Sequence, residues 1–139
     1  MARIMAIDYG SKRVGIAVTD RLQIIATGLT TVHSKDLIEF LKKYFDKEEV
    51  VCIVVGEPKR MNNEPSDSAR FIDPFVLHLK RTFPAVKIER MDERFTSKMA
   101  FQTMIDSGLK KKSRLNKELV DEISAVIILQ SYMNKKSFK

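Results

Sequence analysis

Four acidic residues occupy positions from which their carboxylates could act together. Asp8 directly follows an apolar run, Asp92 and Glu93 follow a second predicted strand, and Asp121 lies on the core-facing stripe of a predicted helix. Clustered carboxylates repel one another and take up protons unless a hard divalent cation keeps them ionised. If they converge at one sheet edge, they form a site for Mg²⁺ or Mn²⁺. Two such ions can activate water and stabilise the leaving oxygen in phosphodiester hydrolysis.

The placement of Asp121 rests on helical periodicity. At about 100° per residue, Ala125, Ile128 and Tyr132 fall on the same stripe as Asp121, so an acid heads a stripe that faces the core. The neighbouring Glu122 points about 100° away and can be solvated.

Each acid also has a simpler structural explanation. Asp8 could cap a turn through its own backbone, and Asp121 could interact favourably with the dipole of a helix N-terminus. Glu93 could pair with Arg90 or Arg94. Spacing alone leaves these alternatives open.

Apolar periodicity predicts an α/β fold with a five-stranded mixed sheet, three antiparallel strands followed by two parallel ones, and helices on both faces. The predicted strands are residues 4–8, 14–20, 22–32, 50–55 and 86–91, and the predicted helices are residues 37–45, 69–79, 97–107 and 117–133. Ser34 is the predicted N-cap of the first helix, Gly28 a possible bulge, and Pro74 should kink or divide the second helix.

Two glycines in the first hairpin have predicted roles. Gly10 stands where the link between the strands suits a positive φ. Gly15 lets backbone or ligand approach closely just after the second strand begins. Together they leave room for a phosphate backbone beside Asp8.

Length and composition favour a single domain over residues 1–139 that needs no disulfide or metal to fold. The apolar residues make up 44% of the chain and the charged ones 31%, and no apolar run is long enough to span a bilayer. The single Cys52 lies in an apolar run, so we expect it to pack in the core. The single cysteine and the absence of a secretory leader predict a cytoplasmic protein. His33 and His78 read as surface or structural residues.

The formal charge of +7 favours a polyanionic partner such as nucleic acid. Charge alone does not distinguish a protein that binds a polyanion from one that binds none. The basic residues 110–114 could form either a solvated loop or a segment that binds nucleic acid.

Four motifs together resemble the YqgF (RuvX-like) family over residues 3 to about 133. They are IDYGSKRVGIA at 7–17, VVGEP at 54–58, DERFT at 92–96 and VDEISA at 120–125. The chain departs from the usual family pattern at Glu57, at Asn62 and Asn63, and at Ile123 and Ser124, and none of these is a proposed ligand.

The resemblance implies an RNase H-like fold and a metal-dependent nuclease whose acidic positions are Asp8, Glu93 and Asp121. In the leading hypothesis Asp8 bridges two Mg²⁺ or Mn²⁺ ions, and Glu93 and Asp121 complete their shell. The residues expected to hold phosphates are Lys12, Arg13, Lys59, Arg60 and Arg94.

The family implies two substrates, the 5′ end of precursor 16S ribosomal RNA and the Holliday junction, so the partner is structured RNA or branched DNA. The protein could be a monomer or a homodimer, although a junction cutter needs two sites acting together. A sugar-kinase-like or actin-like phosphotransferase also carries an Asp-x-Gly hairpin, but that architecture needs two such domains. A non-catalytic nucleic-acid-binding module is the remaining alternative.

Overall fold

The computed structural model describes residues 2–10, 12–57, 69–92 and 117–137. Its five strands form one sheet in the order β3-β2-β1-β4-β5. β1 pairs antiparallel with β2, and β2 pairs antiparallel with β3. β1 pairs parallel with β4, and β4 with β5. The predicted mixed sheet, three antiparallel strands followed by two parallel ones, is therefore confirmed.

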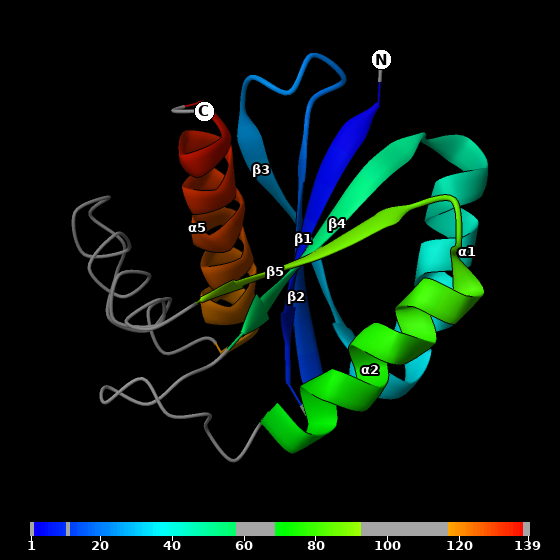
Figure 1. Cartoon of the computed structure of the whole chain (residues 1–139). Coiled ribbons are helices and arrows are strands. Elements are labelled where there is room, and N and C mark those ends of the chain that lie inside the picture. The colour runs from blue at the N-terminus through cyan, green and yellow to red at the C-terminus, as the bar shows by residue number, and fades with distance from the viewer. Residues whose placement is uncertain (1, 11, 58–68, 93–116, 138–139) are drawn as a thin grey trace.

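The strands are β1 Arg3–Tyr9, β2 Arg13–Thr19, β3 Ala26–His33, β4 Val50–Glu57 and β5 Lys87–Asp92, and the helices are η1 Ser34–Asp36, α1 Leu37–Lys47, α2 Ala69–Thr82 and α5 Lys117–Ser137. Helices cover both faces of the sheet, with α1 and α2 on one side and α5 on the other (Figure 1). The chain thus forms three layers with the sheet in the middle.

Alternate residues of the central strands enter two separate apolar clusters. Met5 and Ile7 of β1 belong to the larger cluster, which includes Leu41 of α1 and Leu79 of α2. A smaller cluster lies under α5 and comprises Ile4, Ala6, Ala17, Cys52, Val54, Ala125, Ile128 and Leu129. Because side chains alternate across a strand, β1 and β4 are apolar on both faces. The predicted packing of Cys52 in the core is confirmed.

The third strand begins later than its composition predicts. Residues 22–25 belong to a turn, not to β3, which starts at Ala26. The carboxylate of Asp20 accepts the backbone N–H groups of Ile24 at 2.7 Å, Ile25 at 2.8 Å and Leu22 at 3.2 Å. Gln23 adopts a φ of 58°. A side chain that satisfies three backbone donors stabilises a turn at the expense of the strand.

These three hydrogen bonds predict a pH dependence of stability. The N–H of Ile25, and then those of Ile24 and Leu22, lower the pKa of Asp20 below its usual value. A lowered pKa stabilises the folded state above the unfolded pKa of about 3.9, and this stabilisation is lost as pH falls through the folded pKa. In urea unfolding from pH 6 to pH 2.5, Asp20→Asn should be less stable than the wild type at pH 6, with the deficit vanishing in acid. A deficit of constant size across this range would contradict the assignment.

The bulge predicted at Gly28 lies where the register changes. Ile16 pairs with Thr30 but the next residue, Ala17, pairs with Gly28, so one residue of β3 is left over beside Gly28.

Two predictions about helix boundaries are wrong. Ser34 does not cap α1. Instead Nδ1 of His33 accepts the N–H of Lys35 at 3.2 Å and begins the short helix η1 that leads into α1. His33 is therefore an exposed residue with a structural role, as its isolation in the sequence predicts.

The second wrong prediction is the division of α2, because one helix continues from Ala69 through Pro74 to Thr82. Ile72 lies before the proline and Phe75, Val76 and Leu79 after it, and all four are buried against the sheet. Burial of both halves outweighs the one backbone hydrogen bond that proline removes.

The predicted helix over residues 97–107 and the basic residues 110–114 lie outside the described part of the chain. Within the described ranges, no helix is long and apolar enough to cross a membrane.

Candidate active site

Asp8 lies near the carboxyl end of β1, on the face of the sheet that α5 covers. Ile4 and Ala6 of the same strand enter the cluster under α5, and the alternation of side chains puts Asp8 on that face too. Its side chain is half-buried. A carboxylate here stands at the rim of the apolar layer and not in its centre.

The next residue fixes the end of this strand from the opposite face. The ring of Tyr9 stacks on that of Phe75 in α2, with centroids 4.1 Å apart and planes 11° from parallel. Stacked aromatic pairs stabilise by more than their buried area alone. This stacking therefore holds β1 at the residue after Asp8.

Asp121 reaches the same region through a close contact between α5 and β2. Gly15 is the direct strand partner of Asp8. A Cβ added at Gly15 would overlap the backbone carbonyl of Asp121. Directly opposed residues of an antiparallel pair lie about 5 Å apart, so the backbone of Asp121 lies one strand away from Asp8.

The predicted stripe on α5 is also observed. Ala125 and Ile128 are buried in the cluster under α5, and Tyr132 packs against it. Asp121 precedes them on the same stripe and is half-buried. Helical periodicity therefore placed the acid on the correct face of the helix.

Arg13 forms an ion pair with Asp121. Its Nε donates to Oδ2 of Asp121 over 2.7 Å, and the side chains are 42% and 21% exposed. Lys12, the residue before it, is exposed, and its backbone carbonyl accepts the N–H of Ser34 at 3.0 Å. Arg13 thus borders the face of the sheet that carries Asp8.

Both glycine predictions need correction. Gly10 does not have a positive φ, and it is required because a Cβ there would lie 2.7 Å from the carbonyl oxygen of Arg13. Gly15 does permit a close approach, but the space beside it holds the backbone of α5 and not a phosphate. Glu122 is half-buried, and its side chain lies over Gly28 of β3.

The third predicted ligand follows β5, which ends at the same edge of the sheet. β1, β4 and β5 run parallel, and the last step of the β4–β5 register pairs Glu57 with Asp92. β5 therefore ends one residue before Glu93. Glu93 itself lies outside the described residues, as do Lys59, Arg60 and Arg94. In the described ranges alone, no three His, Cys, Asp or Glu side chains are grouped closely enough to hold a metal ion.

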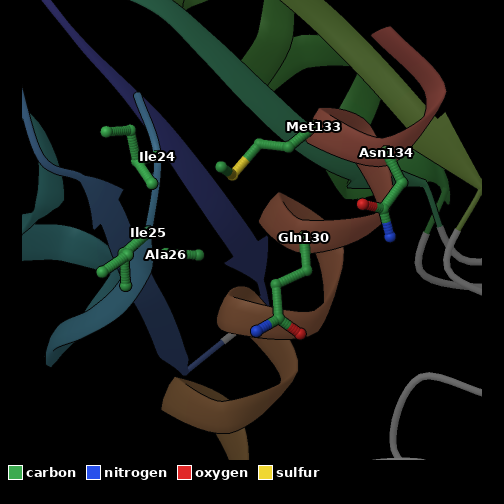
Figure 2. A pocket seen from close by; sticks show the side chains of 6 residues that line it. All are labelled: Ile24, Ile25, Ala26, Gln130, Met133 and Asn134. Carbon is green, nitrogen blue, oxygen red and sulfur yellow. The ribbon is translucent and has the colours of Figure 1, made fainter. Parts of the chain in front are cut away.

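A separate hollow of about 410 Å³ lies farther along α5, between that helix and the turn before β3. Ile24, Ile25 and Ala26 line one side, and Gln130, Met133 and Asn134 line the other (Figure 2). Met133 extends from the helix toward the turn (Figure 2). Among the residues that the structure describes, those that line this hollow are uncharged, and the hollow begins nine residues beyond Asp121 along α5.

No sequence pattern predicts the pair of Arg13 with Asp121, because the two residues are 108 positions apart. The one available signal is Gly15, since a glycine inside a strand often marks a close backbone approach. That signal identifies the place of the approach but not the partner.

The fold is that of RNase H-like α/β proteins. The structure resembles Thermus thermophilus RuvC in complex with a Holliday junction substrate, with a TM-score of 0.57, 15% identity and coverage of 98% of this chain and 96% of RuvC. At this level of identity the likeness concerns the fold alone.

The chain belongs to the RuvX family, described as Holliday junction resolvase, whose model matches residues 2–135. A relative from Flavobacterium johnsoniae is 62% identical over 138 residues, which cover 99% of this chain and 100% of the relative. A second relative, from Flavobacterium psychrophilum, is 64% identical and covers 98% of this chain and 99% of its own length. Both are named "Putative pre-16S rRNA nuclease".

Proposed function

We propose that this protein is a divalent-metal-dependent endonuclease that hydrolyses phosphodiester bonds at the 5′ end of precursor 16S ribosomal RNA. The observation that carries the proposal is the packing of Asp121 against Gly15, the strand partner of Asp8. This contact puts the backbone of Asp121 one strand away from Asp8, which supports a shared site for the two acids. The high identity to relatives named for this activity supports the substrate.

The donor set suits Mg²⁺ or Mn²⁺. Asp8, Asp121 and Glu93 offer carboxylate oxygens, which are the ligands that hard divalent cations prefer. A positively charged group, the Arg13 guanidinium, already lies against Oδ2 of Asp121, which supports a cation site at this carboxylate. When two ions are bound, they supply an activated water and neutralise the leaving oxygen.

The residues of the chain then have distinct tasks. Asp8, Asp121 and Glu93 would hold the metal ions. Arg13 lies beside Asp121 and would bind a backbone phosphate, together with Lys12, Lys59, Arg60 and Arg94. An RNA precursor as substrate implies that the protein acts in the cytoplasm.

The test compares two substrates under identical conditions. Purified protein is incubated with a fragment that spans the 5′ precursor sequence of 16S RNA, and separately with a four-way DNA junction, in Mg²⁺, in Mn²⁺ and in EDTA. We expect cleavage of the RNA with either metal and none in EDTA. An RNA that begins at the mature 5′ end is the matched control and should not be shortened.

Two outcomes would replace the proposal. Cleavage of the junction alone would make the protein a resolvase, the second activity that the family description supports. Binding that does not depend on metal, without cleavage of either substrate, would make it a non-catalytic nucleic-acid-binding module. Mapping the ends of ribosomal RNA precursors after depletion of the protein tests the same proposal in cells.

A further inference from the structure

The contact between Arg13 and Asp121 is held by the backbone and not only by two side chains. Arg13 begins β2, and Gly15, two residues further on the same face, touches the backbone of Asp121. The strand and the helix therefore keep the guanidinium beside the carboxylate. The 2.7 Å distance from Nε to Oδ2 is typical of a charge-assisted hydrogen bond.

In this arrangement the Arg13 guanidinium would compete with a divalent ion for Oδ2 of Asp121. A guanidinium and a divalent ion both bind carboxylate oxygens, and Oδ2 of Asp121 already accepts from Arg13. Two cations at neighbouring positions also repel each other, strongly where solvent is partly excluded. Full coordination of an ion by Asp121 therefore requires Arg13 to leave Oδ2.

We propose that Arg13 is a positioning residue that changes partners, from Asp121 in the free protein to a substrate phosphate when a divalent cation binds Asp121. This inference rests on the proposed function, because it assumes that Asp121 is a metal ligand. The released guanidinium is still exposed and lies on the face of Asp8, where it can bind a phosphate with two parallel hydrogen bonds.

The exchange couples two binding events. Since the cation frees Arg13, it strengthens the binding of nucleic acid, and nucleic acid strengthens the binding of the cation by the same factor. Because of this coupling, the Arg13 guanidinium binds phosphate only when the metal needed for hydrolysis is present.

The first test measures Mn²⁺ affinity by calorimetry without nucleic acid. Removal of the competing cation in Arg13→Gln should tighten Mn²⁺ binding about three- to tenfold, the range expected for the loss of a half-exposed, charge-assisted contact. Arg21→Gln is the matched control. Arg21 lies beyond the other end of β2 and pairs with a carboxylate, Oε2 of Glu48, at 3.5 Å. The control variant therefore also loses one positive charge and one ion pair, but at a place far from the site.

The second test measures the affinity for a fluorescent RNA fragment by anisotropy, with and without Ca²⁺ in place of Mg²⁺ to slow hydrolysis. Wild type and Arg21→Gln should bind the RNA more tightly when the cation is present. Arg13→Gln should lose most of this increase, which a purely structural role of Arg13 would not predict. Thermal unfolding of each variant verifies that the fold is intact.

The outcomes separate this inference from the proposed function. Equal Mn²⁺ affinity of the wild type and Arg13→Gln would overturn the exchange of partners and leave the nuclease assignment standing. Failure of both proteins to bind Mn²⁺, or Mn²⁺ binding that Asp121→Asn leaves unchanged, would overturn the metal site on which both proposals depend. Tighter binding by Arg13→Gln with an unchanged effect of the cation on RNA affinity would overturn the transfer to phosphate.

Discussion

Replacing Asp8 by Asn should reduce the rate of RNA cleavage by at least about a hundredfold, the size of effect seen when one group that stabilises transition-state charge is removed. Asparagine has nearly the same shape as aspartate but lacks the charge that would hold two metal ions together. The rate is measured under single-turnover conditions with saturating Mg²⁺, so that weaker binding of RNA does not mask the loss.

The fold of Asp8→Asn should remain intact. The side chain is half-buried at the rim of the apolar layer, and the stacking of Tyr9 on Phe75 holds the strand from the other face. Asp46→Asn is the matched control, because Asp46 is exposed on α1, across the sheet from the site. Cleavage by Asp8→Asn at the rate of the control would remove Asp8 from the proposed mechanism.

The second large effect is expected from Gly15→Ala. The new Cβ would overlap the backbone carbonyl of Asp121, and neither strand nor helix backbone can shift freely in a packed layer. Overpacking of this kind costs about 1–3 kcal/mol or more, and so lowers the thermal midpoint by several degrees. The helix must also move away from β2, which carries Asp121 away from Asp8. Cleavage should therefore fall well below wild type at temperatures where the variant is still folded.

Gly28→Ala provides the matched control for this prediction. A Cβ at Gly28 would meet the Glu122 side chain, 2.5 Å from Oε1, and not the backbone of α5. Since a flexible side chain can rotate aside, this variant should lose less stability and keep most of its activity. If the two alanine variants behaved alike in cleavage, the contact at Gly15 would have no special role in positioning Asp121.

Several parts of the fold were predictable because their cause is local. The continuous apolar run of β4 predicts a strand buried on both faces, and the spacing of Ala125 and Ile128 predicts which side of α5 meets the sheet. Both follow from the period of one element and need no knowledge of its neighbours.

The wrong predictions have causes that composition and periodicity do not contain. Pro74 has an unfavourable effect on any isolated helix, yet α2 continues through it because both of its halves are buried. Residues 22–25 have the composition of a strand, yet the carboxylate of Asp20 satisfies their backbone N–H groups in a turn. The cause is tertiary for Pro74 and local for Asp20, and neither follows from the apolar pattern of the element itself.

The candidate active site also has a part that was predictable from the sequence and a part that was not. The sequence by itself determined that acids stand near the end of β1, directly after β5 and on the inner stripe of α5, because strand ends and helical stripes follow from local periodicity. Only the tertiary structure decided that α5 crosses β2 at Gly15, and hence that Asp121 lies beside the strand partner of Asp8 and pairs with Arg13. The physical reason is that this contact depends on how the surfaces of β2 and α5, more than a hundred residues apart in the sequence, fit together. The periodicity within either element does not predict that fit.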